Sequence, residues 1–503
     1  MSKLKQLLSR FLPPSARGFH EKAHELLAIT TKLTQMNASL QDELLKQNEQ
    51  MAFLQSGVLQ EIQNMQAQNT EIHDKILECF SKMDGQLVAI NHTDKSIGDL
   101  SSALLREITS AKKEIKDTRV MLRDFIKHSA ETILKDKPVN KSRYLFVNDT
   151  FDTFHHGCTG TSFVIRKMLG DSVASVRFEL LLSYMAPKKI EDFFSEEFKI
   201  KWERENDWLI NKAELCDEIV INGEGSMAMY RPFTLNYFYL AYYCMKHLGK
   251  KVHVINHSIG LTQYHVEMSE TDAENFSSII KLVYSDVSSC YVRETESMSC
   301  MESILPGKAK LSFDCLPIYI TKYYKQTDNI VRNKIVISGG NFLPDWFPRF
   351  IDEVLKSLPE DFSDMPVKFL LSEMPCKEYT GDVNLYKAIT KSVGKQVDLV
   401  AVSSTDEWLD ELAFASIFIS GRFHHSIACF MLDTPFLAFK TNNKKMEGML
   451  DIIKKKDCLL DGDFEEVVER SATILRNRDF YNPNSEAIKN MIVDLAYANF
   501  EFI

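Results

Sequence analysis

The sequence lacks several features that mark large classes of protein. Nowhere in its 503 residues is there an apolar run of about 18 residues, the length that a helix needs to cross a bilayer. The N-terminus has no apolar core or small-residue cleavage site of a secretory signal. The ten cysteines include no C-x-x-C pair, so neither a zinc site nor a disulfide framework is predicted. The formal net charge of −10 disfavours nucleic acid as a partner. We therefore expect a cytoplasmic protein with reduced cysteines.

Glycine and proline are also scarce before residue 140, where Gln, Glu, Lys, Leu and Met dominate. Beyond that point, apolar and β-branched runs alternate with helical segments. A polar stretch without periodicity divides this second part near residues 322–332. We predict a short amphipathic helix with a proline-containing linker, a coiled coil, and two globular domains. Their bounds are 1–25, 26–135, 140–325 and 330–503.

Apolar residues of the second segment recur at steps of three and four, the pattern of a coiled-coil seam. The seam begins with Leu26, Ile29, Leu33, Met36 and Leu40. Strict heptads follow from Phe80 onward, so left-handed supercoiling should be concentrated there. We predict a homo-oligomer assembled through this coiled coil. A solitary antiparallel hairpin or a frayed helix would show a similar pattern.

Residues 1–14 form a short amphipathic pattern ahead of the coil. Leu4, Leu7, Leu8 and Phe11 share one helical face, and basic residues lie off it. This pattern is typical of a helix lying on a membrane surface, here the cytoplasmic face of the inner membrane. It is equally typical of a helix docked on protein, and the sequence does not choose between the two.

The remainder of the chain predicts ten strands separated by helices. They are RYLFVND, ASVRFELLL, DEIVING, KVHVINHSIG and CYVRE in the first half, then NKIVISGG, VKFLLSE, VDLVAVSS, ASIFISG and TPFLAFK. Short apolar runs that alternate with helices indicate parallel sheets covered on both faces. We therefore predict an α/β fold of two Rossmann-like domains facing across a cleft (GT-B-like), with the site where the strand carboxyl ends meet.

Two glycine-containing turns follow predicted strands. INGEGS places Gly223, Gly225 and Ser226 between a strand and a helix, and ISGGNF places Asn341 after the first strand of the second half. Such turns let backbone N–H groups approach a phosphate or a carboxylate. A plain tight turn would look the same. Arg293 stands just after a short strand. By itself, an arginine at such a position is more often a partner in a surface ion pair than a ligand-binding residue.

Four polar residues follow the first strand of the first half: Asn148, Asp149, His155 and His156. Two adjacent histidines could bind a metal, but neighbouring side chains diverge. No acidic or cysteine partner stands at a familiar spacing. We predict no metal site here.

The stretch SGRFHHSIACFMLDTPFLAFKTNNKKMEGML resembles the C-terminal signature of polysaccharide pyruvyl transferases. That signature has a Ser-x-Arg-x-His element before a helix, then a strand and a Lys-containing loop. The matching residues are Ser420, Arg422 and His424, followed by Lys445 and Gly448. CYVRETESMSC and AKLSFDC are similar to the family's Val-Arg-(acidic)-x-x-Ser stretch and its Asp-containing strand, and INGEGS resembles its glycine-rich turn. These matching residues are Arg293, Ser297 and Asp314.

The resemblance implies transfer of a pyruvyl group from phosphoenolpyruvate to two hydroxyls of a sugar, which forms a cyclic ketal. His424 would be the general acid, and no cofactor or metal would be required, because arginine can neutralise the departing phosphate. The implied donor-binding residues are Arg422, Arg293, Ser420, Gly223, Gly225, Ser226, Asn341 and Lys445. The acceptor would be a sugar, or a polyprenyl-linked saccharide, of a bacterial surface polysaccharide or its precursor.

The acceptor side departs from the family pattern. The usual opening turn reads roughly Gly-Asn-x-Gly-Asp, and here it is NDTFDTFHHGCTG. The residues that could bind the acceptor or take its hydroxyl proton are Asn148, Asp149, His155, His156, Glu224 and His257. The sequence does not rank them.

Two other functions stay open. A glycosyltransferase could use the Arg422 and His424 loop to hold the diphosphate of a nucleotide sugar. A non-catalytic scaffold could work through its coiled coil, with the α/β part binding glycan or partner enzymes.

Overall fold

The computed structural model describes the α/β part of the chain. The described residues are 142–151, 155–170, 173–177, 185–261, 268–326, 330–340, 343–362, 364–372, 381–441, 443–476 and 486–503. The predicted N-terminal helix, the coiled coil and Asn341 lie outside these residues. In the part of the chain that the structure describes, every helix is too short or too polar to span a bilayer.

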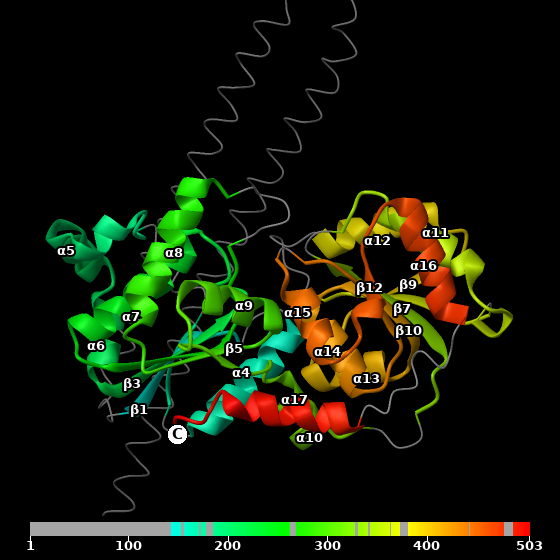
Figure 1. The fold of residues 1–503 in the computed structure, drawn as a ribbon. Coiled ribbons are helices and arrows are strands. Elements are labelled where there is room, and N and C mark those ends of the chain that lie inside the picture. Colours follow the sequence, from blue (N-terminus) through cyan, green and yellow to red (C-terminus); the bar gives the residue numbers. More distant parts are fainter. Residues whose placement is uncertain are drawn as a thin grey trace, which may run out of the picture. The chain divides into compact units, whose positions relative to one another are not determined.

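The first half contains a six-stranded parallel sheet in the order β2-β1-β3-β4-β5-β6, of which Figure 1 labels β1, β3 and β5. Its strands are β1 (Ser142–Asp149), β2 (Ala174–Arg177), β3 (Cys216–Glu224), β4 (Lys251–His257), β5 (Ser289–Val292) and β6 (Lys310–Leu311). Six consecutive residues of β1 and of β3 are buried, as expected for strands covered on both faces.

Helices connect these strands and cover the sheet. They are α4 (His156–Leu169), η3 (Ile190–Phe194), α5 (Glu196–Glu205), α6 (Asp207–Glu214), α7 (Pro232–Lys246), α8 (Glu270–Tyr284), α9 (Thr295–Ile304) and α10 (Leu316–Lys322). Local sequence sets several of their starts. The Ser269 side chain accepts a hydrogen bond from Asp272 N at the start of α8, and proline stands in the first turn of α7.

The second half contains a parallel sheet in the order β12-β11-β10-β7-β8-β9. Its strands are β7 (Lys334–Gly340), β8 (Val367–Leu370), β9 (Val397–Val400), β10 (Ala415–Gly421), β11 (Phe436–Phe439) and β12 (Leu459–Leu460). Its helices are α11 (Phe347–Ser357), η4 (Glu360–Phe362), α12 (Gly381–Ser392), α13 (Thr405–Ala413), α14 (Phe423–Met431), α15 (Lys445–Ile452), η5 (Lys456–Cys458) and α16 (Phe464–Arg476). The predicted α/β architecture of two Rossmann-like domains is confirmed.

Strand order reverses once in each sheet, between β1 and β3 and between β7 and β10. Open α/β sheets bind ligands outside the strand carboxyl ends at such switch points. At the second switch point two glycines let the backbones approach. A Cβ on Gly340 would stand 2.8 Å from Gly421 Cα. The fold therefore offers two adjacent positions for a ligand.

A shared apolar core joins the two halves. Leu316 of α10, Trp408 of α13 and Ile427 of α14 are fully buried in one cluster that also contains Phe146 of β1 and Val336 of β7. Helix α10 contacts both α4 and α14. This packing fixes the carboxyl edges of the two sheets relative to each other, which a site built from both requires.

The C-terminal helix α17 (Glu486–Ala498) returns to the first half, although the sequence assigned residues 330–503 to the second domain. It packs on α10 (Figure 1), and the ring of Phe502 lies 6.0 Å from that of Tyr144 in β1. Asn499 is fully buried and accepts from Asn256 N at 2.7 Å. It also donates to the carbonyl oxygen of Phe313 at 2.8 Å. Through this bond Asn499 anchors the backbone of Phe313, directly ahead of Asp314.

Replacement of Asn499 by alanine should lower the free energy of unfolding by about 1–3 kcal/mol, because buried backbone groups lose their partners. Asn490→Ala, at an exposed position of α17, should change it by less than about 0.5 kcal/mol. Urea denaturation of both variants measures the difference. Equal effects would show that the Asn499 contacts contribute nothing.

Candidate active site

A cavity of about 270 Å³ lies between the two halves. Its lining comes from segments that follow strands of both sheets. The lining residues are His155, His156, Gly157, Cys158, Glu224, Gly225, Ser226, Phe233, Arg293, Ser372, Gly421, Arg422, Phe423, His424, His425, Thr441 and Lys445. Residues beyond β1, β3 and β10 are among them, so both switch points open into this cavity.

Three helices begin at the cavity. His155 stands at the N-cap position of α4, and Arg422 at that of α14. Lys445 is the first residue of α15. All three residues line the cavity. The first turns of α4 and α14 contain no acidic residue. Unsatisfied N–H groups and the positive end of the helix dipole favour an anion at such positions.

The ionisable side chains of the cavity are predominantly basic. Two arginines, one lysine and four histidines face a single carboxylate, Glu224, among the described lining residues. The arrangement therefore favours a ligand with more than one negative charge.

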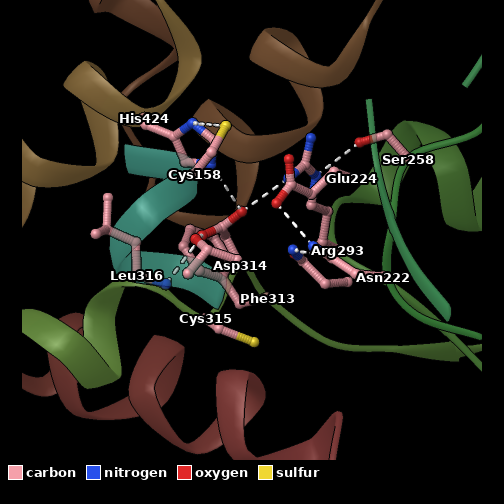
Figure 2. Close-up of polar contacts among 12 residues, drawn as sticks. Cys158, Asn222, Glu224, Ser258, Arg293, Phe313, Asp314, Cys315, Leu316 and His424 are labelled. Carbon is pink, nitrogen blue, oxygen red and sulfur yellow. Dashed lines mark hydrogen bonds and ion pairs between the residues drawn. The ribbon is translucent and has the colours of Figure 1, made fainter. Parts of the chain in front are cut away.

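His424 belongs to a buried charged cluster (Figure 2). Its Nε2 lies 3.3 Å from Asp314 Oδ2, and Arg293 Nη1 donates to the same oxygen at 2.8 Å. Thr161 Oγ1 and Leu316 N donate to Asp314 Oδ1 at 2.8 and 2.9 Å. Burial opposes ionisation of this carboxyl, but the adjacent His424 and Arg293 outweigh it and hold the pKa of Asp314 below its usual range. Asp314 is therefore a carboxylate that orients the His424 ring.

The other ring nitrogen of His424 points to Cys158. Nδ1 lies 3.9 Å from Cys158 Sγ (Figure 2). Burial and the neighbouring Glu224 raise the pKa of this thiol well above its usual range, so it stays protonated. Because Asp314 occupies Nε2, a proton that His424 exchanges with a ligand must leave from Nδ1.

Arg293 and Arg422 are both paired with carboxylates. Besides Asp314, Arg293 donates from Nε to Ser258 Oγ at 2.8 Å, and its guanidinium stands 4.5 Å from the centre of the Phe423 ring. Arg422 Nη2 lies 3.1 Å from Asp382 Oδ1. The Arg422 side chain keeps 14% of its area exposed, against 2% for Arg293. Arg422 is the arginine that a ligand reaches more easily.

Ser420 supports the turn before α14 and is not among the lining residues. Its Oγ donates to Gly339 O at 2.8 Å and accepts from Arg422 N at 3.1 Å. These bonds fix the backbone of Arg422. The structure thus places Ser420 behind the cavity, not at the position expected of a donor ligand.

Lys445 is 9% exposed and reaches the cavity beside the glycine turn, where its Nζ would stand 3.2 Å from a Cβ on Gly225. Burial, together with the charge of Arg293, lowers its pKa to about 8. Among the residues that the structure describes, no acceptor lies within hydrogen-bond distance of Nζ. The Lys445 ammonium contacts the face of the Phe423 ring, 5.8 Å from the ring centre, and keeps its hydrogen-bond donors available for an anion.

Glu224, at the end of β3, and Gly225 and Ser226, in the turn after it, line the cavity. Gly223 is not a lining residue and packs against His257 instead. A Cβ on Gly223 would stand 2.5 Å from His257 Nδ1. Glu224 has a positive φ of 39°. Its Oε1 accepts from Thr150 Oγ1 at 2.9 Å and from Asn222 Nδ2 at 2.8 Å. These bonds hold the carboxylate at the cavity wall.

Three of the predicted acceptor residues do not line the cavity. Asn148 Oδ1 accepts from Tyr237 Oη at 2.9 Å, and Asp149 pairs with Arg166 at 2.5 Å. His257 is fully buried, and burial and the charge of Arg293 lower its pKa to about 3. These side chains hold the sheet edge in place.

The histidines near the cavity differ in their surroundings. Burial and the charge of Arg422 lower the pKa of His155 to about 4. Burial also lowers the pKa of His156, which stacks on Trp408, and that of His425. All three are neutral near pH 7. Among the described residues, no group of three or more His, Cys, Asp or Glu could hold a metal ion.

Sequence reasoning missed several residues of the site, notably Gly157, Cys158 and Asp382. The first two follow the predicted His pair directly, so their place after β1 was a usable signal. Asp382, the second residue of α12, is buried and accepts a hydrogen bond from Ser372 N at 3.0 Å; nothing in its local sequence separates it from an exposed acidic residue.

Gly157→Ala should misplace His424, because the new Cβ would stand 2.2 Å from His424 Cβ. We expect kcat to fall by about 100-fold, the cost of a catalytic group displaced by about 1 Å. Gly394→Ala is the control, since a Cβ there meets nothing within 4 Å. Unchanged turnover in Gly157→Ala would contradict the placement of His424.

Two Rossmann-like domains thus line one cavity beside the switch points of their sheets, and its ionisable side chains are mostly basic. Residues 165–443 match the sequence profile of the polysaccharide pyruvyl transferase family, which is more than half of the chain. The chain belongs to that family and is a transferase of polysaccharide modification. No curated protein matches it.

Solved structures of low sequence identity share similarity with this chain. Anabaena HepE in complex with UDP-glucose is 12% identical, with a TM-score of 0.44 over 71% of this chain and 95% of that one. S. aureus MnaA with UDP is 11% identical, with a TM-score of 0.45 over 72% of this chain and 98% of that one. The Neisseria meningitidis UDP-GlcNAc 2-epimerase bound to UDP-GlcNAc is 12% identical, with a TM-score of 0.44 over 71% of this chain and 98% of that one.

Proposed function

We propose that this enzyme transfers the pyruvyl group of phosphoenolpyruvate to two hydroxyls of a saccharide and forms a cyclic ketal. The observation that carries the proposal is the position of His424. Its Nε2 is held by the buried carboxylate of Asp314, and its Nδ1 lies 3.9 Å from Cys158 Sγ. Both His424 and Cys158 line the cavity together with Arg422 and Lys445. This arrangement suits an acid that protonates an anionic donor.

The donor's two anionic groups have separate partners. Arg422 and Lys445, together with the start of α14, are suited to the phosphate and the carboxylate. Arg293 is paired with Asp314. It therefore contributes a positive electrostatic potential to the donor site and holds Asp314 in place beside His424. Phosphoenolpyruvate fits this division because its charges lie at both ends of a three-carbon unit.

The proposed reaction balances without a cofactor. His424 Nδ1–H donates its proton to the methylene carbon, which becomes a methyl group as C2 becomes electrophilic. One hydroxyl oxygen bonds to C2, and its proton passes to a base. The bond between C2 and the phosphate oxygen then breaks, the second hydroxyl bonds to C2, and its proton leaves with hydrogen phosphate. Proton exchange with solvent restores the acid and the base.

Glu224 is the base that we propose for the first hydroxyl. It is the carboxylate of the cavity lining, and the hydrogen bonds to its Oε1 fix its position. Asn148, Asp149 and His257 face other partners, while the neutral His155 and His156 suit hydrogen bonds to the saccharide.

Donor binding should weaken as the pH rises through about 8. Lys445 is an ammonium below this pKa and a neutral amine above it, so its attraction for phosphate is lost on the alkaline side. Calorimetric titration of phosphoenolpyruvate across this range measures the effect. Lys445→Gln should flatten the profile, and Lys444→Gln, at an exposed position, should retain it. An unchanged profile in Lys445→Gln would remove Lys445 from the donor site.

Calorimetric titration with two donors at fixed pH tests the proposed function without the acceptor. We expect phosphoenolpyruvate to bind and UDP-glucose not to compete with it. Arg422→Ala should weaken binding about 10- to 100-fold, as expected for a lost charged hydrogen bond of about 1.5–3 kcal/mol. Arg349→Ala, at an exposed position of α11, should bind normally. Binding of UDP-glucose alone would favour glycosyl transfer instead.

A further inference from the structure

A second cavity of about 270 Å³ adjoins the first. One face of α9 supplies Glu296, Ser299, Cys300 and Ser303, which follow each other at helical spacing. The other lining residues are Ile259, Gly260, Leu261, Glu294, Asn443, Lys444 and Lys445. Helix α9 and the start of α15 both line this cavity, and the two helices contact each other.

The chemistry of this second cavity differs from that of the first. Its two carboxylates are matched by two ammonium groups, and hydroxyl and amide groups stand between them. Glu294 is already engaged, since Ser297 N donates to its Oε2 at 2.7 Å. Ile259 and Leu261 add an apolar wall. Balanced charge, many hydrogen-bonding groups and one apolar wall suit a neutral ligand rich in hydroxyls better than a second anion.

Lys445 lines both cavities. It is 9% exposed, and its Nζ lacks a hydrogen-bond partner among the described residues. An unpaired polar group in a buried position is costly unless a ligand satisfies it. Because the same side chain borders both spaces, a molecule in the second cavity would lie directly beside one in the first.

We propose that the second cavity binds the acceptor as a hexopyranoside, with its reacting hydroxyls directed past Lys445 toward the donor. The inference rests on the proposed function and assigns the acceptor's place within it. Glu296, Ser299 and Asn443 would hydrogen-bond the ring hydroxyls, and the apolar wall would contact the C–H face of the sugar. Sequence reasoning expected the acceptor in the first half, at residues at or beyond the ends of β1, β3 or β4 that it did not rank. The second cavity is also lined from the first half, by residues after β4 and by α9, and from the second half by the start of α15.

A thiol introduced at Ser303 reports occupancy of this cavity. Ser303 is exposed, and its Oγ donates to the carbonyl oxygen of Cys300, three residues earlier. Thr390 is the matched control, because it is also exposed, helical and bonded to a carbonyl three residues earlier, that of Lys387. The rate of iodoacetamide alkylation at Ser303→Cys and Thr390→Cys is followed by peptide mass spectrometry in the full-length protein. Ser299→Cys, also exposed, replaces Ser303→Cys if that variant unfolds.

The probes are the methyl glycosides of galactose, glucose and mannose, and phosphoenolpyruvate. We expect at least one glycoside to slow alkylation at Ser303→Cys, by about tenfold at about ten times its Kd, since only the unliganded fraction reacts. Thr390→Cys should react at the same rate throughout, and phosphoenolpyruvate should leave Ser303→Cys unprotected.

Two results would overturn the inference. One is phosphoenolpyruvate binding by calorimetry without protection of Ser303→Cys by any glycoside, which leaves the proposed donor intact. The other is protection by phosphoenolpyruvate as strong as by the glycosides. Glycoside protection without phosphoenolpyruvate binding would instead support the saccharide site and remove the proposed donor.

Discussion

Replacement of His424 by asparagine should lower kcat by about 10²- to 10⁴-fold, the usual contribution of a general acid. Asparagine keeps a polar side chain but cannot deliver a proton to the donor's methylene carbon. Phosphoenolpyruvate should still bind, because Arg422 and Lys445 are unchanged. Steady-state phosphate release and calorimetry separate these two effects.

His247→Asn is the matched control for His424→Asn. His247 is exposed at the end of α7 and is not a cavity residue, so its loss should leave turnover unchanged. If His424→Asn retained the turnover of the parent protein while remaining folded, His424 would not be the acid.

Replacement of Asp314 by asparagine should affect both stability and turnover. Asp314 is fully buried, accepts a hydrogen bond from the Arg293 guanidinium and lies 3.3 Å from His424 Nε2. Without the carboxylate, the buried Arg293 keeps its charge and loses its partner, which costs about 3–5 kcal/mol. The His424 ring also loses its orientation, so kcat should fall with it. Urea denaturation and phosphate release measure the two losses.

The effect of Asp314→Asn should depend on pH. The pKa of Asp314 is lower in the folded protein than in the unfolded chain. Its stabilisation is therefore present above the unfolded pKa, about 3.9, and is lost as the pH falls through the folded value. The difference in unfolding free energy between the two proteins should be largest near neutral pH and shrink in acid.

Asp286→Asn is the control for this effect. Asp286 pairs with Lys246 at the surface, where both side chains are more than 40% exposed. Such pairs contribute about 0–1 kcal/mol. A loss in Asp314→Asn no greater than in Asp286→Asn would contradict the buried network.

The strands of the fold could be predicted well from the sequence. All ten predicted runs contain a strand, because buried parallel strands are continuous apolar segments with clear polar ends. Strands β6 and β12 lie outside these ten runs; each has two residues and lies at a sheet edge. The family resemblance of AKLSFDC implied a strand at β6. The return of α17 to the first half could not be foreseen either. Its contacts through Asn499 join residues far apart in the chain.

The site could be predicted in part. Arg422, His424, Glu224 and Lys445 do line one cavity, since residues at strand carboxyl ends converge in such folds. Ser420 and Asp149 also lie at strand ends, but their side chains bond a backbone carbonyl and Arg166. Gly223 lies against His257 instead. Orientation depends on tertiary packing, which local sequence does not encode. For the same reason, the pairing of Arg422 with Asp382 had no sequence signal.

The measurement that tests the central claim most directly is turnover of phosphoenolpyruvate in D₂O with the methyl glycosides as acceptors. We predict glycoside-dependent phosphate release and a ketal whose methyl group carries one deuterium, delivered by His424. Both signals should disappear in His424→Asn. Turnover of UDP-glucose with nucleotide release, and none of phosphoenolpyruvate, would contradict the account.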